Sequence, residues 1–476
     1  MVDIPDSPDA RRHILQGIAA LVGVTAMGLA ECKAQTPSDK GTPNKGAVDP
    51  RTFGARVDGA SDDSAALLAA ARTNRAILID GHMYINRKVD LPPDVALLGS
   101  GVYRSAIRLG PQGKLRISGE SFERRAGGAV FRDLTIAPVD RANSDDGIEL
   151  RHVQHILFDN VTFYRLSLLL DEHHYVTFRA CRFFGESGKS YLRSNCASQP
   201  AGAASISECA VFTGCVFASH PVILEDTVGP RFTDSIFFGG EYAIRSMPRL
   251  ARGSDVEPFF MGPVINGCVF DSIDGPAIEI EGGGTDCRIV NNIISGGRPT
   301  HKPGMILTRS SGVELIGNRF EWCGMAGLRL VNCEKIGIIS NSFANMAAGS
   351  AIRAENSHEM RVIGNAFENM RRWGGSAEGF TTLAIEDADG RCRNWVVIGN
   401  TSSGLRDPRI STLDKSIVQA NTGWPPSTEQ GWPSGNSADR PHGVRDGYRW
   451  YDETLSQWIQ WHQGSGRWRD ASGRAL

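Results

Sequence analysis

Acidic and imidazole side chains are concentrated between residues 145 and 174. Asp145 and Asp146 precede an alternating segment that carries Glu149, and the next such segment ends at Asp171, two residues before His173. If the two segments are neighbouring strands offset by two residues, a strand spacing of about 4.8 Å and a rise of about 6.6 Å place Glu149 and Asp171 roughly 8 Å apart. That separation suits inverting glycoside hydrolysis, whose acid and base lie about 6.5–9.5 Å apart.

An imidazole gives these five residues a second chemistry. His173 could remove the proton next to a uronate carboxylate in a β-elimination, or serve as a metal ligand. His173 and His174 point to opposite sides of an extended chain, so at most one of them faces a given ligand. The structural alternatives are an ordinary Asp-Asp-Gly turn and an exposed histidine pair.

Charged residues also recur at the outward positions of later alternating segments. Guanidinium groups bind uronate carboxylates in bidentate fashion, while acids transfer protons or bind Ca²⁺. No cofactor is required by this pattern, and Ca²⁺ is compatible with it. A solvated face of Glu–Arg pairs explains the same residues. The predicted substrate-binding residues are Glu225, Arg245, Glu279, Arg329 and Arg353.

A repeat with steps of roughly 20 to 34 residues must position these side chains. It places Phe, or once Ile, two residues after a small or polar residue, and a short alternating strand follows. Stacked coils of three short strands form a parallel β-helix, so the fold class is all-β and both columns are structural. The small or polar column is Val161, Cys181, Cys215, Ser235, Cys268, Asn292, Asn318, Asn341, Asn365 and Asn400. The apolar column is Phe163, Phe183, Phe217, Phe237, Phe270, Ile294, Phe320, Phe343 and Phe367.

The segment FGARVDGASDDSAAL, residues 53–67, begins the solenoid. Asp58-Gly59 predicts a tight turn, Ser61 or Asp62 caps a helix that begins near Asp63, and an apolar strand follows at residues 76–79. This helix is predicted to cover the open end of the coils, so its acidic cluster is scaffold. The segment resembles the signature that opens the domain of the pectate lyase superfamily, which includes rhamnogalacturonase-like, epimerase-like and phage-tailspike-like proteins.

The resemblance implies a right-handed parallel β-helix over residues 50–425 and a carbohydrate ligand. Residues 142–149 resemble the "N-T-D-G" element of β-helix glycosidases. The "G-H-G" and "R-I-K" elements of polygalacturonases are missing, which argues against a pectinase.

The two ends of the chain have other compositions. Arg11-Arg12 before an apolar run resembles a twin-arginine export signal, predicted over residues 1–32, with a linker at 33–49. A lipid anchor at Cys32 is a weaker alternative, and a periplasmic or extracellular protein without a membrane span is expected. Residues 426–476 hold five of the nine tryptophans and resemble a β-hairpin module of phage tail and surface proteins. Those rings serve either the core of the module or glycan contact.

These observations predict an exported enzyme that degrades an acidic polysaccharide by β-elimination or inverting hydrolysis. A net charge of −2 gives no attraction toward nucleic acid. A non-catalytic carbohydrate-binding or structural β-helix protein and a uronate epimerase are the alternatives, and the oligomeric state stays open.

Overall fold

The structure is a computed structural model. It describes residues 46–139, 146–186, 188–196, 207–248, 262–284, 287–296, 302–346, 349–368, 384–403, 410, 415–422, 434–435, 437–440, 449–452, 454–462, 465–470 and 473–476. The predicted export signal with Arg11, Arg12 and Cys32, and most of the linker, lie outside these residues, as does Asp145.

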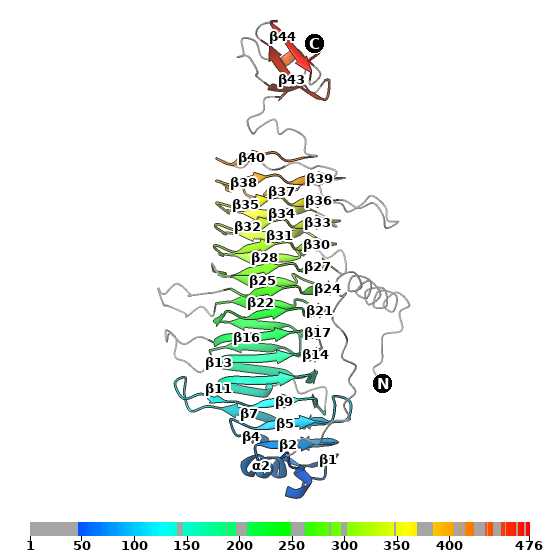
Figure 1. The fold of residues 1–476 in the computed structure, drawn as a ribbon, viewed down its shortest axis with the longest axis vertical. Coiled ribbons are helices and arrows are strands. Elements are labelled where there is room, and N and C mark those ends of the chain that lie inside the picture. The colour runs from blue at the N-terminus through cyan, green and yellow to red at the C-terminus, as the bar shows by residue number, and fades with distance from the viewer. Residues whose placement is uncertain are drawn as a thin grey trace, which may run out of the picture. The chain divides into compact units, whose positions relative to one another are not determined.

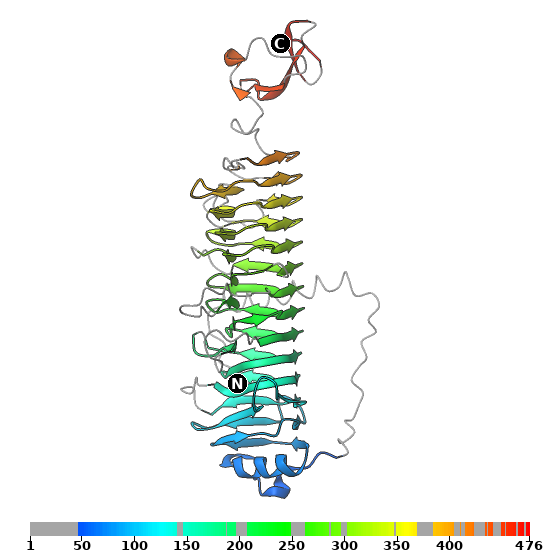
Figure 2. The ribbon, with the colours of Figure 1, turned by 90° about the vertical axis from the view of Figure 1, so that its left-hand side faces the viewer.

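Parallel strands of successive coils stack into three sheets (Figures 1 and 2). Sheet 1 contains β1 (Asp58–Asp62), β3 (His82–Ile85), β6 (Ala106–Leu109), β10 (Thr135–Pro138), β12 (Thr162–Tyr164), β14 (Arg182–Phe184), β17 (Val216–Ala218), β21 (Ile236–Phe238), β24 (Val269–Ile273), β27 (Ile293–Gly296), β30 (Arg319–Glu321), β33 (Ser342–Ala344), β36 (Ala366–Glu368) and β39 (Thr401–Ser403). The predicted all-β parallel solenoid is confirmed.

The other two sheets share the long strands β11 (Asp146–Asp159) and β13 (Ser167–Arg179), which bend from one sheet into the next. Sheet 2 also contains β4 (Lys88–Asp90), β7 (Lys114–Ser118), β15 (Leu192–Asn195), β18 (Val222–Glu225), β22 (Ile244–Met247), β25 (Ile278–Glu281), β28 (Met305–Thr308), β31 (Ala326–Val331), β34 (Ser350–Glu355) and β37 (Ile385–Asp387). Sheet 3 also contains β2 (Ala76–Ile79), β5 (Ala96–Gly99), β9 (Val130–Arg132), β16 (Ser207–Thr213), β20 (Arg231–Thr233), β23 (Val264–Asn266), β26 (Arg288–Val290), β29 (Glu314–Ile316), β32 (Gly337–Ile339), β35 (Arg361–Ile363), β38 (Val396–Ile398) and β40 (Ile417–Gln419). The short strands β8 (Ala126–Gly127) and β19 (Thr227–Val228) pair with β11 and β16.

An asparagine ladder fixes the turn between sheets 3 and 1. Asn341 Oδ1 accepts a hydrogen bond from the Asn318 amide at 2.8 Å, and its Nδ2 donates to the Leu315 carbonyl at 2.9 Å. The residue before each asparagine turns left-handed, as Gly317 does with φ 66°. Buried backbone groups at the turn are thereby paired without water, which confirms the predicted structural column and extends it to Asn421.

Two columns of phenylalanine rings fill the core beside this ladder. Along the predicted column, ring centroids lie 4.8, 4.5, 4.4 and 4.8 Å apart from Phe163 to Phe270. A second column runs from Phe131 through Phe158, Phe178 and Phe212 to Phe232. The coil spacing thus matches the stacking distance of the rings.

The acidic segment near residue 58 makes local backbone contacts. Asp58 Oδ1 accepts from the amides of Ala60 and Ser61 at 2.9 and 2.7 Å, and Asp62 Oδ1 accepts from the Ser64 amide at 3.1 Å. The 3₁₀ helix η1 (Pro50–Phe53) and the helix α2 (Ser64–Thr73) lie at this end, and the buried residues Leu67 and Ala70 of α2 join the main core. These contacts support a structural role for the acidic segment. That α2 covers the open end of the coils stays a prediction.

The C-terminal segment forms a four-stranded sheet of its own. It contains β41 (Ser434–Gly435), β42 (Arg449–Asp452), β43 (Gln457–His462) and β44 (Arg467–Asp470), with the 3₁₀ helix η2 (Ser437–Asp439) beside them. Trp468 is buried with Ile459, and its ring meets Trp461 edge-on at 5.5 Å. These two tryptophans serve the core of the small sheet.

Candidate functional site

A single column of residues runs along the outer face of sheet 2. Because side chains alternate along each strand, partners in register point to the same face on every coil. The column is Arg116, Glu149, Leu169, Arg193, Ile223, Arg245, Glu279, Ile306, Arg329, Arg353 and Glu386. Four of the five predicted substrate-binding residues share it, and Glu225 lies two residues further along its strand.

The predicted carboxylate pair lies at the N-terminal part of this face. Glu149 is in register with Leu169, so Asp171 is offset from it by two residues, as predicted. Glu149 is 9% exposed and contacts Lys114 Nζ at 3.5 Å and Arg151 Nη2 at 3.3 Å. Arg151 Nε lies 3.3 Å from Asp171 Oδ2, so this guanidinium bridges the two acids.

Accessibility separates these two acids. The Asp171 side chain is only 1% exposed, so as placed it does not reach a ligand outside the coil. For Asp146 the structure describes the backbone, which pairs with Ser167 at the start of the same strands.

The next residues along β13 leave the outer face altogether. Glu172 has a left-handed backbone with φ 53°, which shifts the alternation and buries His173 completely. His173 Nε2 lies 2.8 Å from Ser194 Oγ, and burial lowers the pKa of this imidazole to about 3. His173 is therefore an interior neutral imidazole and does not face the groove, whereas His174 points outward and lies 2.7 Å from Glu208 Oε2.

The middle of the column carries aromatic rings and cations, which we call the central patch: Tyr191, Arg193, Tyr242, Arg245 and Glu279. The guanidinium carbon of Arg193 lies 4.9 Å from the Tyr191 ring centre, and that of Arg245 lies 3.9 Å from the Tyr242 ring centre. Arg245 Nε also bonds to Glu279 Oε2 at 2.7 Å. Within the described part of the chain, no carboxylate forms an ion pair with Arg193.

The phenol of Tyr242 sits among these charges. Burial raises its pKa, against the opposing effect of Arg245 and Arg193. The phenol therefore keeps its proton at neutral pH and is a hydrogen-bond donor. The patch combines apolar ring faces, an available cation and proton donors, which suits the recognition of a charged sugar.

The arginines nearer the C-terminal end of the column are engaged with acids. Arg329 Nη2 lies 3.0 Å from Glu355 Oε1, and Arg353 Nη1 lies 3.3 Å from Glu386 Oε1. These ion pairs agree with the structural alternative for the outward charged residues, a solvated face of Glu–Arg pairs. Arg193 differs from them because no described acid pairs with it. It was missed in the sequence, although it lies ten residues after Phe183, as Arg353 does after Phe343.

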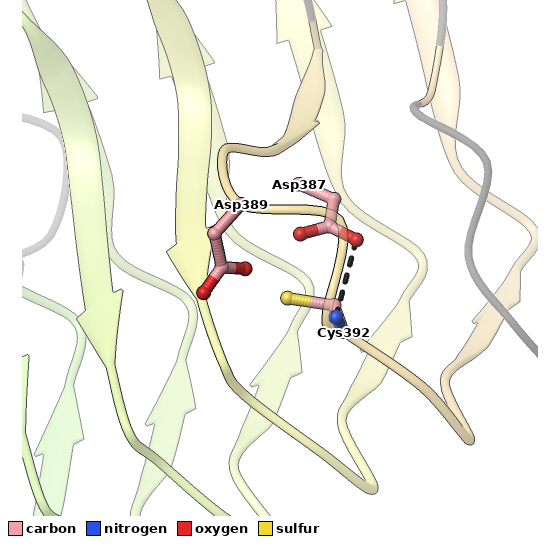
Figure 3. Close-up of side chains that lie close together, drawn as sticks. All are labelled: Asp387, Asp389 and Cys392. Carbon is pink, nitrogen blue, oxygen red and sulfur yellow. Dashed lines mark hydrogen bonds between the residues drawn. The ribbon is translucent and has the colours of Figure 1, made fainter.

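One group of described side chains has the composition of a metal site. Donor atoms of Asp387, Asp389 and Cys392 all lie within 4.8 Å of one another (Figure 3). Asp387 accepts from the amides of Gly390 and Cys392 at 2.9 and 3.1 Å, so its oxygens close a turn. Burial raises the pKa of the Cys392 thiol to about 12, which disfavours the thiolate that a soft metal needs. The group fits a hydrogen-bonded turn.

Comparisons with known proteins agree with this architecture. Residues 276–421 match the family model "Right handed beta helix region". Tailspike protein 3 of bacteriophage CBA120 is 24% identical with a TM-score of 0.72, over 96% of this chain and 77% of the phage chain. The fold is a right-handed parallel β-helix.

More distant structures were also found. The A-module of a mannuronan C-5 epimerase from Azotobacter vinelandii is 15% identical with a TM-score of 0.47, over 79% of this chain and 99% of the other. The catalytic domain of a GH87 alpha-1,3-glucanase is 13% identical with a TM-score of 0.45, over 82% and 71%. The comparison with curated proteins found no match. No helix within the described residues has the length and apolar character of a membrane span.

Proposed function

We propose that this protein binds an acidic polysaccharide along the outer face of sheet 2 and cleaves it there, outside the cytoplasm. The observation that carries the proposal is Arg193, a guanidinium with no ion pair among the described residues, which lies over the ring of Tyr191. A guanidinium that has no acid of its own is available for a uronate carboxylate. The leader-like sequence with Arg11-Arg12 supports export.

β-Elimination is the reaction class that this arrangement supports best. In that reaction a base takes the proton at C5, the C4–O bond breaks as the C4=C5 bond forms, and the departing oxygen takes a proton. Glu279, the carboxylate of the central patch, would be the base that takes the C5 proton. Arg193 would neutralise the uronate carboxylate, which makes the C5 proton more acidic. Tyr242, which keeps its proton at neutral pH, would supply the proton for the departing oxygen.

Inverting hydrolysis is the second candidate because Glu149 and Asp171 have the predicted offset of two residues. It requires Asp171, which is buried against Arg151, to activate a water. Asp145 and Asp146 belong to this hypothesis as neighbouring acids. A non-catalytic binding protein would use the same central patch without turnover.

The experiment incubates the full chain with a panel of bacterial and plant acidic polysaccharides. Reducing ends and the ultraviolet absorbance of a C4=C5 bond are followed together, with and without a Ca²⁺ chelator. Elimination raises both signals, hydrolysis raises only reducing ends, and epimerisation changes neither but alters the uronate composition. Loss of activity with the chelator would add Ca²⁺ as a ligand of the acids on this face.

Two arginine variants from the same column make the test specific. Arg193→Ala removes the available cation and should weaken binding about ten- to hundredfold, as expected for a charge-assisted hydrogen bond. Arg353→Ala removes a cation already paired with Glu386 and should leave binding close to native. Equal effects of the two variants would contradict the assignment of Arg193. If the protein neither binds nor cleaves any polysaccharide of the panel, the proposed function is rejected.

A further inference from the structure

Two aromatic rings lie side by side where β11 and β13 bend from sheet 2 into sheet 3. The ring centres of His155 and Tyr175 are 5.5 Å apart with planes within 6° of parallel, and Tyr175 is 44% exposed. The His174 ring lies 4.2 Å from Tyr175. The pair of Glu208 with His174 Nε2, at 2.7 Å, holds that imidazole beside the ring.

The fold itself does not call for aromatic residues at this bend. On successive coils the same left-handed position is occupied by His155, Tyr175, Cys209 and Gly229, with φ of 52°, 54°, 53° and 59°. Left-handed backbone is unfavourable for bulky side chains, and glycine or a small residue satisfies it at lower cost. Glycine and cysteine do so on the two later coils, so the rings on the two earlier coils are not explained by the turn.

The rings border a shallow hollow that is open to solvent. It measures about 430 Å³ and is lined by His155, Ile156, Leu157, Tyr175 and Thr177. Small-molecule sites in proteins commonly occupy about 300–1,000 Å³ and combine apolar walls with a few polar groups. Here the ring faces and Leu157 are apolar, while the imidazole, the phenol and the Thr177 hydroxyl are hydrogen-bonding groups.

We propose that the His155–Tyr175 ring pair is a second saccharide-binding subsite, separate from the central patch. A sugar ring has apolar C–H faces and a rim of hydroxyl groups, which match a ring face surrounded by polar groups. The hollow is lined by no carboxylate and no guanidinium. The residues that line the hollow would therefore contact the sugar ring and not the carboxylate of the sugar. The choice of a saccharide rests on the proposed function, because a polysaccharide bound in the central patch extends beyond that patch.

The test measures the affinity of the full chain for two probes, an oligouronate and a neutral oligoglucoside, by calorimetry. Tyr175→Ala should raise Kd for the bound probe about three- to tenfold, the range expected for loss of an aromatic contact. His155→Ala should have a similar effect, and Tyr175→Phe should keep most of the affinity because it keeps the ring. Tyr103→Ala is the matched control, since Tyr103 is 92% exposed at another place.

Thermal melting of each variant ensures that the folded chain is compared. A Kd unchanged by Tyr175→Ala, in a chain whose binding still falls with Arg193→Ala, would overturn the subsite and leave the proposed function intact. Loss with Tyr175→Ala but not with Arg193→Ala would support the subsite and reject the central patch. A native chain that binds neither probe would overturn both.

Discussion

Two buried histidines should make the protein lose stability between pH 7 and pH 5. Burial lowers the pKa of His173 to about 3 and that of His220 to about 4, from an ordinary value of 6.5. His173 bonds to Ser194, while His220 Nε2 lies 2.8 Å from the Leu166 carbonyl and its ring packs on Phe183. Both imidazoles are therefore neutral in the folded chain at pH 5, whereas in the unfolded chain both are protonated.

The direction follows from proton uptake. A histidine whose folded pKa is lower than its unfolded pKa binds a proton on unfolding at any pH between the two values, so acid favours the unfolded chain. Stability is complete above about pH 6.5 and falls as the pH decreases toward the folded pKa. At 1.36 kcal/mol per pKa unit, each histidine removes about 2 kcal/mol between pH 7 and pH 5, and the pair about 4 kcal/mol. Carboxylates, with unfolded pKa values of about 4, stay ionised in both states over this range.

Urea unfolding followed by circular dichroism at pH 7 and pH 5 measures this loss. His173→Gln and His220→Gln keep a hydrogen-bonding side chain but cannot take up the proton, so each should reduce the pH 7 to pH 5 loss by about 2 kcal/mol. His82→Gln is the control, because His82 is exposed. If both buried variants lose as much stability as the native chain on acidification, the argument from burial is refuted. The experiment also separates unfolding from site titration in any activity profile measured below pH 6.5.

Three further substitutions test the supports of the fold and its outer face. Asn341→Ala removes the ladder contacts to the Asn318 amide and the Leu315 carbonyl, so buried polar groups lose their partners; we expect a cost of about 2–4 kcal/mol in urea unfolding. Phe217→Ala leaves a gap in the ring column and should cost about 3–5 kcal/mol, which the same assay measures. Arg353→Ala removes an ion pair whose side chains are 34% and 23% exposed, and we expect a cost below about 1 kcal/mol in that assay; a larger cost would contradict its description as a solvated pair.

The columns of the solenoid could be predicted because they repeat. Equivalent positions of successive coils stack on one another and need the same type of side chain, so that type recurs in the sequence. The spacing alone therefore predicted the asparagine ladder from Asn292 to Asn400 and the phenylalanine column. The offset between Glu149 and Asp171 followed from the same alignment. Arg193 was not predicted, although it lies ten residues after Phe183, the same spacing that separates Arg353 from Phe343.

Burial at the bends could not be read from alternation. Alternation assigns Asp171 and His173 to the same face and Glu172 to the other, but the left-handed Glu172 interrupts the pattern and all three become buried. Such a bend depends on the neighbouring coils and has no short sequence signal. His173, the predicted base, therefore lies inside the coil, whereas His174, one residue later, points outward.

Repetition also provides a criterion for function in this molecule. In the interior columns every coil needs the same type of side chain. Stacking explains the residues of these columns, so they carry no information about a ligand. On the outer column Arg329 and Arg353 pair with acids, so the coils explain them as well. Stacking leaves Arg193 and Tyr175 unexplained, because Arg193 is a cation with no acid partner among the described residues and Tyr175 is an exposed ring at a turn that glycine satisfies two coils later. Variants at these two positions should therefore change binding and leave unfolding nearly unchanged, the opposite of what the ladder and ring variants are expected to do.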